Sequence, residues 1–143
     1  MKINVYLEAK AYVPLRGHAT DAGLDLRTPV DVVVPSRLCF WKPYAIIDTG
    51  VHVEIPEGYV GFLKSKSGLN VKHGLTGEGV IDAEYTGSIV VKLYNNSWRR
   101  YKFNKGDKII QLVILPVETA ELQYVGKLKE TERGNNGFGS TGR

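Results

Sequence analysis

The sequence is poor in the residues that build disulfide frameworks and metal clusters. Its single cysteine, Cys39, cannot form an internal disulfide or a cysteine-based zinc site. The histidines His18, His52 and His73 lack the spacing of metal ligands, so a histidine metal triad is not expected. A reducing, intracellular location in the cytoplasm is the simplest interpretation of this cysteine usage.

Long apolar runs are also absent, and no membrane span is therefore expected. Residues 1–5 do not begin the apolar region and cleavage site of a secretory signal. The chain has 143 residues, enough for one domain, with a net charge of +4 and a pI near 9.1. This mild positive charge suits an anionic ligand such as a nucleotide, and by itself it suits nucleic acid equally well.

Short β-branched or alternating apolar segments recur along the chain. They cover residues 3–7, 30–34, 51–55, 88–94 and 108–115. Turn residues such as Pro35, Gly58 and Gly106 bound them. This spacing predicts an all-β sandwich or barrel, with at most one short helix at residues 69–73.

The last thirteen residues differ in composition from the rest. Residues 131–143 contain one apolar side chain, Phe138, among several glycines, so they are predicted to form a mobile arm on a domain of residues 1–130. A frayed tail is the simpler interpretation. However, the glycines, Arg133, Ser140 and Thr141 suit phosphate binding and Phe138 suits stacking on a base, which together would make a lid.

Two segments carry side chains that suit a metal-bound phosphate. Asp25 stands between two leucines, so in a strand it would point to the opposite face from them. It is either a solvated surface carboxylate or a group held near a hydrated Mg²⁺, which prefers oxygen ligands. In residues 64–69, two lysines, two hydroxyls and a glycine suit a phosphate contact, with Lys66, Ser67 and Gly68 among them, although charged loops of this kind are often plain surface.

Two further segments place single polar residues in apolar surroundings. Asp82 follows two β-branched residues in a hairpin-like segment, residues 79–87. It is either a turn-forming residue or a base that orients and deprotonates a water molecule. Gln111 interrupts an apolar strand, so it is either a hydrogen-bonded link in the core or a ligand contact.

In their order and spacing these segments resemble the five motifs of the trimeric, all-β dUTP pyrophosphatase (dUTPase) family. The resemblance runs from about residue 19 to residue 142. The segments similar to motifs one to five are residues 22–26, 66–69, 79–87, 106–112 and 133–142. The last of these matches its motif at every position that defines the family.

The resemblance implies a jelly-roll-like β-barrel that assembles as a homotrimer, with active sites at subunit interfaces. It implies hydrolysis of dUTP to dUMP and pyrophosphate with Mg²⁺, which keeps uracil out of DNA and supplies dUMP for dTMP synthesis. Asp82 would bind the 3′-hydroxyl and act as general base for the water that attacks the α-phosphorus. Tyr85 would exclude a ribose 2′-hydroxyl, and Asp25 would hold Mg²⁺ through its waters.

The remaining site residues are also implied by the resemblance. Uracil would be read by backbone groups of residues 75–80, and the arm would close over the site. The implied substrate contacts are Lys66, Ser67, Gly68, Gly79, Val80, Tyr85, Gln111, Arg133, Phe138, Gly139, Ser140 and Thr141. Neither a membrane nor a nucleic acid is an expected partner.

The chain departs from the usual motifs at two lysines. Lys66 and Lys108 stand where motifs two and four often carry arginine. Lysine keeps the charge but lacks the bidentate geometry of a guanidinium group, so the phosphate contact is expected to differ. The segment between residues 69 and 82, where base recognition is implied, is slightly short for the family.

Two alternative functions remain open at this point. A dCTP deaminase, or a bifunctional deaminase and dUTPase, is a relative with similar motifs, but it needs a glutamate where this chain has Lys92. A catalytically silent relative that binds dUTP for regulation has no chemical need for Asp82, Tyr85 and Arg133 together. The dUTPase interpretation is therefore favoured.

Two tryptophans and one basic run are not assigned to the site. Trp41 and Trp98 are expected in the core or in a subunit contact. The basic run at residues 99–102 is expected to be a solvated face, with nucleic-acid binding as the less favoured interpretation.

Overall fold

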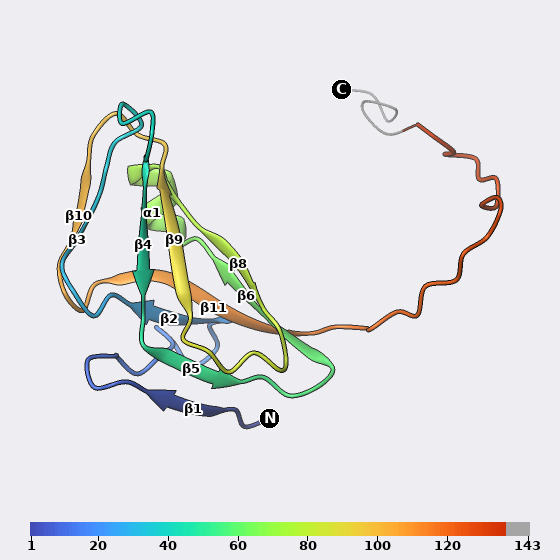
Figure 1. Ribbon diagram of the computed structural model, residues 1–143, viewed down its shortest axis with the longest axis horizontal. Coiled ribbons are helices and arrows are strands. Elements are labelled where there is room, and N and C mark those ends of the chain that lie inside the picture. The colour runs from blue at the N-terminus through green and yellow to red at the C-terminus, as the bar shows by residue number, and fades with distance from the viewer. Residues whose placement is uncertain (137–143) are drawn as a thin grey trace.

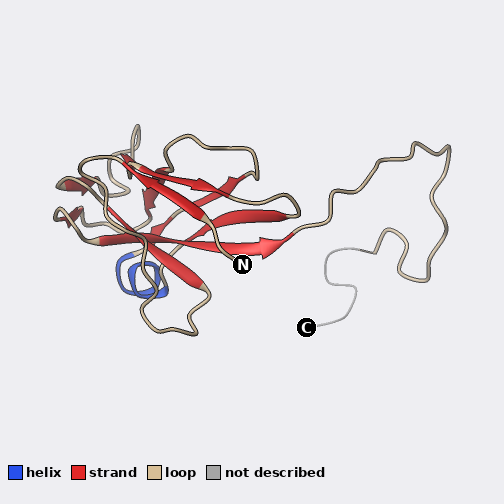
Figure 2. Cartoon of the chain, turned by 90° about the horizontal axis from the view of Figure 1, so that it is seen from below, coloured by secondary structure: helices blue, strands red, loops and turns tan. Residues whose placement is uncertain are grey.

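The computed structural model describes residues 1–136, which form short antiparallel strands and one short helix (Figures 1 and 2). The strands are β1 (Asn4–Leu7), β2 (Gly23–Arg27), β3 (Val32–Val34), β4 (Tyr44–Asp48), β5 (Val51–Glu54), β6 (Tyr59–Lys64), β7 (Leu75–Thr76), β8 (Glu78–Ile81), β9 (Val90–Asn95), β10 (Tyr101–Phe103) and β11 (Lys108–Pro116), and the helix is α1 (Ser67–His73). No helix among these residues is long and apolar enough to cross a membrane.

The strands form four separate hydrogen-bonded groups. The largest sheet has the order β2-β11-β6-β8, the second has the order β4-β9-β7, and two pairs are β1-β5 and β10-β3. The predicted all-β, jelly-roll-like class is confirmed. Its strands are not closed into a barrel, because no ladder joins these groups within the described residues.

The core is built by the inward side chains of strands from both larger sheets and both strand pairs. Val51, Val53 and Ile55 are buried while Glu54 is exposed, as the alternation in residues 51–55 predicts. Leu26, Ile47, Val91, Phe103 and Leu112 complete the same cluster from other strands. Burial of these apolar side chains is the main favourable contribution to folding.

Of the two places expected for the tryptophans, the core is wrong, and the subunit contact stays a prediction. Trp41 is 95% exposed and lies in the loop between β3 and β4. Trp98 is 63% exposed and lies in the loop between β9 and β10. Both loops connect strands across the surface, and a connecting loop carries even large apolar side chains into solvent.

Helix α1 begins two residues before the predicted helix at residues 69–73 and ends with it at His73. Gly74 stops the helix, because it adopts a left-handed conformation (φ 67°) and its N–H donates to the Asn70 carbonyl over 2.8 Å. No residue of α1 is fully buried, and Leu69 is the partly buried side chain that packs the helix against the core. Figure 2 shows α1 at one side of the strands.

Gly77 is the point at which the chain changes sheets. Before it, β7 pairs with β9; after it, β8 pairs with β6. The Ser65 hydroxyl holds this point, since it donates to the Gly77 carbonyl (3.1 Å) and accepts from the Gly77 N–H (2.9 Å). A Cβ at Gly77 would lie 2.9 Å from the Lys92 carbonyl oxygen, which permits only glycine there.

Beyond Gly77, β8 and β9 diverge, as Figure 1 shows. β8 is the edge strand of its sheet, and β9 pairs with β7 only at Tyr94 and Asn95. No ladder joins β8 to β9 in the described part of the chain. The facing edges of β8 and of residues 90–93 therefore have no strand partner, and the turn 82–89 joins their far ends.

The described residues after β11 form neither strand nor helix. The Val117 N–H still donates to the Gly58 carbonyl (2.9 Å), and from there to residue 136 every residue is exposed. Figure 1 shows this segment leaving the strands. Its side chains Leu122, Tyr124 and Leu128 are 79%, 94% and 81% exposed. So many exposed large apolar side chains in one segment are unusual for a monomeric protein.

Replacing Gly77 with alanine should destabilise the fold by about 1 to 3 kcal/mol, because the added methyl group meets a backbone oxygen that cannot rotate away. Gly68→Ala is the matched control: an added Cβ there meets no atom within 4 Å, and alanine favours a helix. Urea unfolding of both variants measures the difference. Equal stability of the two variants would contradict the role of Gly77.

Candidate active site

Strand β11 aligns polar residues from three segments in one row across the large sheet. In its ladders, Gln111 lies opposite Asp25 of β2 on one side and opposite Lys64 of β6 on the other. Lys64 in turn lies opposite Glu78 of β8. The register thus brings predicted site residues from motifs one and four next to the start of motif two.

Asp25 forms the centre of a three-residue ion cluster with Lys66 and Lys108. It is only 6% exposed; its Oδ1 pairs with Lys66 Nζ, and its Oδ2 lies 2.7 Å from Lys108 Nζ. Burial raises the pKa of Asp25, but hydrogen bonds from Lys108 and Lys66 outweigh it and leave the pKa below its usual value. The interpretation of Asp25 as a solvated surface carboxylate is wrong.

Gln111 is held beside this cluster. Its Nε2 donates to the Ser65 carbonyl over 3.2 Å, and a Cβ at Gly23 would lie only 2.4 Å from its Oε1. Glycine at position 23 therefore makes room for the amide. Gln111 is a polar link between β11 and the segment that leads into α1, and it remains partly exposed.

Ser67 and Gly68 continue the same surface. They are the first two residues of α1, directly after Lys66, and both are exposed. Together with Lys66 and Lys108 they give this region cations, a hydroxyl and free backbone N–H groups, which suit the oxygens of a polyphosphate.

A second group of predicted residues lies on the turn between β8 and β9. The Asp82 carboxylate is exposed, and the Asp82 carbonyl accepts a hydrogen bond from the Tyr85 N–H over 3.1 Å. The Tyr85 hydroxyl donates to the Ser88 carbonyl (2.9 Å), and its ring covers Gly87, where a Cβ would lie 2.5 Å from the hydroxyl oxygen. The tyrosine ring is thus fixed on the same turn as the exposed Asp82 carboxylate.

The two remaining residues of this group, Gly79 and Val80, lie on β8. A Cβ at Gly79 would lie 3.0 Å from the Leu63 side chain, so a side chain there would push Leu63 aside. Only its backbone is available to a ligand. Val80 is 58% exposed on the opposite face.

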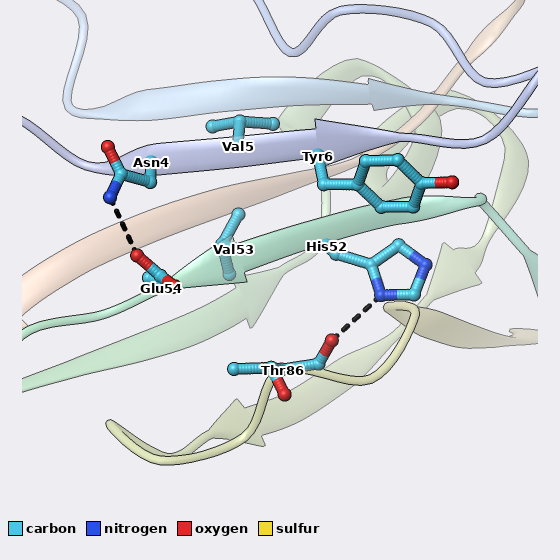
Figure 3. A pocket seen from close by; sticks show the side chains of 7 residues that line it. All are labelled: Asn4, Val5, Tyr6, His52, Val53, Glu54 and Thr86. Atoms are coloured by element: carbon cyan, nitrogen blue, oxygen red, sulfur yellow. Dashed lines mark hydrogen bonds between the residues drawn. The ribbon is translucent and has the colours of Figure 1, made fainter.

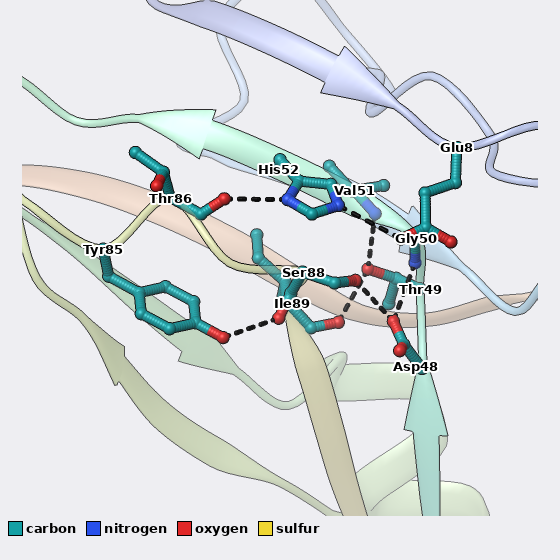
Figure 4. Close-up of polar contacts among 10 residues, drawn as sticks. All are labelled: Glu8, Asp48, Thr49, Gly50, Val51, His52, Tyr85, Thr86, Ser88 and Ile89. Atoms are coloured by element: carbon teal, nitrogen blue, oxygen red, sulfur yellow. Dashed lines mark hydrogen bonds and ion pairs between the residues drawn. The ribbon is translucent and has the colours of Figure 1, made fainter.

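The turn is anchored from behind by a polar network (Figure 4). The His52 Nδ1 lies 2.8 Å from the Thr86 carbonyl oxygen, and its Nε2 lies 3.2 Å from Glu8 Oε1. The Ser88 hydroxyl donates to Asp48. The Thr86 carbonyl, followed by the Glu8 carboxylate, raises the pKa of His52, because the protonated ring donates to both.

A pocket of about 200 Å³ lies between β1, β5 and this turn (Figure 3). Tyr6, His52 and Thr86 are among its lining residues, and Asn4 donates to Glu54 at its other end over 2.7 Å. None of the predicted site residues lines it. The pocket therefore lies behind the turn and is separate from the predicted site.

Within one chain, the Asp25 cluster and the turn that carries Asp82 lie far apart. Asp25 and β8 are separated by three strand spacings, about 14 Å, and Asp82 lies four residues beyond Glu78, about 13 Å along the strand. The two carboxylates are thus on the order of 20 Å apart in one chain. That is too far for both to act on one phosphate group.

The C-terminal predictions are only partly within the described residues. Arg133 is exposed, and its Nε donates to the Asn136 carbonyl over 3.1 Å. Phe138, Gly139, Ser140 and Thr141 lie outside the described residues.

Two residues with structural roles at the site were not predicted. Lys108 was noted only as a departure from the family motif, yet it binds the same carboxylate as Lys66. Ser65 ties the start of motif two to Gly77. The signal available for Lys108 was that the motifs carry several lysines but place only Asp25 in an apolar strand as their counter-ion. No feature of the neighbouring sequence indicates that Ser65 binds Gly77.

Comparison with known proteins gives a consistent result. The family model described as dUTPase matches residues 9–142. The deoxyuridine 5′-triphosphate nucleotidohydrolase of Kluyveromyces lactis is 42% identical over 94% of this chain and 89% of its own length. The enzyme of the same name from Anaplasma marginale is 40% identical over 99% of both chains.

Solved structures agree with these relatives. A mutant dUTPase of Staphylococcus bacteriophage 80alpha with dUpNHpp has a TM-score of 0.88 and 34% identity over 99% of both chains. A mutant dUTPase from phage phi11 of S. aureus, described with a coordinated structural Mg(II) ion, has a TM-score of 0.79 and 35% identity. That match covers 89% of this chain and 98% of the phage chain.

Replacing Asp25 with asparagine should lower the free energy of unfolding at pH 7 by about 1 to 3 kcal/mol, because it leaves two ammonium groups without their anion. The folded-state pKa of Asp25 is lowered, so its stabilising effect is present above pH 3.8 and is lost as the pH falls through the folded pKa. The difference between the two proteins should therefore shrink in acid. Denaturant unfolding across pH measures it, and a constant difference would contradict the ion cluster.

Proposed function

This chain belongs to the dUTPase family, and we propose that it is a dUTP nucleotidohydrolase that cuts dUTP into dUMP and pyrophosphate. The observation that carries the proposal is the exposed Asp82 carboxylate beside the fixed Tyr85 ring, at the end of two strand edges that lack partners. In the cell this activity would keep uracil out of DNA and supply dUMP for dTMP synthesis.

The divergence of β8 and β9 provides a place for the base. Uracil presents one N–H donor between two carbonyl acceptors. An open strand edge carries backbone C=O and N–H groups that can accept from this donor and donate to these acceptors. The backbone at Gly79 and Val80 lies on such an edge. Tyr85 at the end of this opening would pack against the deoxyribose and leave no room for a 2′-hydroxyl.

Asp82 would act as the general base. Its carboxylate takes a proton from water as the water oxygen bonds to the α-phosphorus. The bond from that phosphorus to the bridging oxygen breaks, and pyrophosphate leaves with the oxygen. No ion pair of Asp82 exists within residues 1–136, so the carboxylate is free to accept the proton.

Lys66, Lys108, Ser67 and Gln111 would bind the phosphate chain, and Asp25 would hold the waters of a bound Mg²⁺. The described residues contain no group of three or more metal-binding side chains. One carboxylate fits a hydrated ion that shares its ligands with substrate phosphates, provided that Lys66 and Lys108 leave Asp25 and turn to those phosphates. When bound, the ion would neutralise negative charge on the triphosphate.

The site would be shared between subunits of a homotrimer. Support for sharing comes from the separation of Asp25 and Asp82 in one chain, on the order of 20 Å. Further support comes from the exposed apolar residues of the segment after β11, which need a surface to cover. Motif five, with Arg133, Phe138, Gly139, Ser140 and Thr141, would then close over a site in the assembly.

A dCTP deaminase is not favoured. The position where that enzyme needs a glutamate is Lys92, whose ammonium group lies 4.1 Å from the centroid of the Tyr44 ring. Contact with Tyr94 raises the pKa of Lys92, so the residue stays a cation and cannot shuttle a proton as a carboxylate does.

Asp82→Asn should lower the rate of dUTP hydrolysis by about 10²- to 10⁴-fold, because the amide cannot take the proton from water. Glu84→Gln is the matched control on the same turn and should retain activity. Product analysis with dUTP, dCTP, dTTP and UTP in the presence of Mg²⁺ measures both. Deamination of dCTP, or an active Asp82→Asn, would refute the proposal.

Mixing two inactive variants tests whether sites are shared. If each site takes Asp82 from one chain and Lys66 from another, trimers co-refolded from Asp82→Asn and Lys66→Ala chains should regain about a quarter of wild-type activity. The double variant Asp82→Asn/Lys66→Ala, refolded alone, is the control and should stay inactive. Activity no greater than that of the separate variants would mean that each site lies within one chain.

A further inference from the structure

Two loops expose large aromatic side chains at the end of β9 opposite to the Asp82 turn. The first loop connects β3 to β4 and exposes Phe40 at 85% and Trp41 at 95%. The second connects β9 to β10 and exposes Trp98 at 63%. The Arg37 N–H donates to the Ser97 carbonyl over 2.9 Å, so the two loops lie side by side.

A buried asparagine fixes the shape of both loops. Asn95 is 1% exposed, and its Nδ2 lies 2.9 Å from the Arg99 carbonyl oxygen and 3.3 Å from that of Val34. Its Oδ1 accepts from the Ser97 N–H over 2.9 Å. The side chains on these loops are therefore presented by a preorganised backbone, which lowers the entropy cost of binding.

Positive charge surrounds the aromatic rings. The basic residues on the two loops and at the end of α1 are Arg37, Lys42, Lys72, Arg99 and Arg100, and none of them forms an ion pair within residues 1–136. Residues 35–43 and 96–106 contain no acidic residue. Lys102 differs, because Asp31 lies 3.5 Å from it.

Trp98 stands between two open clefts. One, of about 470 Å³, is also lined by Arg37 and Phe40; the other, of about 630 Å³, is also lined by Arg99 and Arg100. The Arg37 guanidinium carbon lies 4.2 Å from the centroid of the Trp98 ring and covers one of its faces. The first cleft thus combines aromatic rings with one guanidinium group, and the second combines the Trp98 ring with two guanidinium groups that form no ion pair within residues 1–136.

We propose that this surface binds single-stranded nucleic acid. Its residues are Arg37, Phe40, Trp41, Trp98, Arg99 and Arg100. Unpaired bases stack on exposed aromatic rings, and the phosphates between them pair with cations along the same groove. A duplex keeps its bases stacked inside and offers no face to Trp41, so single strands are favoured over duplex.

This proposal goes beyond dUTP hydrolysis and uses none of the residues assigned to it. It revises the expectation that nucleic acid is not a partner. The expectation treated residues 99–102 as a solvated face and placed Trp41 and Trp98 in the core or in a subunit contact. Their exposure excludes the core, and the quenching experiment below tests the subunit contact.

The test uses the full-length wild-type protein and labelled oligothymidylate and oligouridylate of about 20 nucleotides, a length that spans one or two binding sites of this kind. Fluorescence anisotropy should show binding of at least one strand, weakening with added salt. Trp41→Ala and Trp98→Ala should each weaken it roughly fivefold or more, and Trp41→Phe should retain it. Arg99→Ala/Arg100→Ala should reduce the slope of log affinity against log salt by about 1.4.

Control variants separate this surface from general charge and exposed rings. Tyr6→Ala removes an exposed ring on β1, and Lys2→Ala/Lys10→Ala removes two distant charges; both should bind as the wild type does. The tryptophan variants should keep the dUTP hydrolysis rate of the wild type. If neither the wild type nor any variant hydrolyses dUTP, the proposed function is refuted, and the binding measurements still test the nucleic-acid proposal independently.

Several outcomes would overturn the proposal. These are no binding of either strand at low salt, undiminished binding by both tryptophan variants, and equal binding of a duplex. Binding of polyglutamate with the same tryptophan dependence would indicate an acidic protein partner instead. Shielding of the tryptophans from iodide quenching in the unliganded assembly would show that the surface is a contact between copies.

Discussion

The two hydrogen-bond ladders of β11 determine the register of the large sheet and with it the position of the predicted site residues. By pairing with β2 on one side and β6 on the other, this strand sets Asp25, Gln111 and Lys64 in one row. A shift of one residue in either ladder would turn the site residues to the other face of the sheet and place core residues in solvent. The core and the surface proposed to bind phosphate are therefore specified by the same register, and neither can be changed alone.

The sequence predicted what depends on local pattern and missed what depends on distant pairing. The alternation at residues 51–55 and the short helix ending before Gly74 were both recognisable, because neighbouring residues determine them. The burial of Asp25 was not, since its counter-ions lie on other strands and loops. The motifs identified the family, whereas the open arrangement of the sheets and the exposure of Trp41 depend on the paths of connecting loops, which local pattern does not encode.

The lysines that replace the family's usual arginines meet at one carboxylate. Each ammonium group is compact and can point at a single oxygen, so Lys66 and Lys108 divide the two oxygens of Asp25 between them. Two cations around one anion leave a net positive charge at this place. The cluster thus holds β2, β11 and the start of α1 together, and its excess positive charge would attract the polyphosphate of the proposed substrate.

The open edges of β8 and β9 also bear on how the protein behaves when it is crowded. A strand edge with free N–H and C=O groups is a template for any other extended chain, and this is the usual starting point of aggregation. The short length of β8, the charge of Glu78 and the twist away from β9 limit that hazard without removing it. A nucleotide bound along these edges would occupy the same N–H and C=O groups. The substrate of the proposed reaction would therefore stabilise the folded protein and protect it from aggregation.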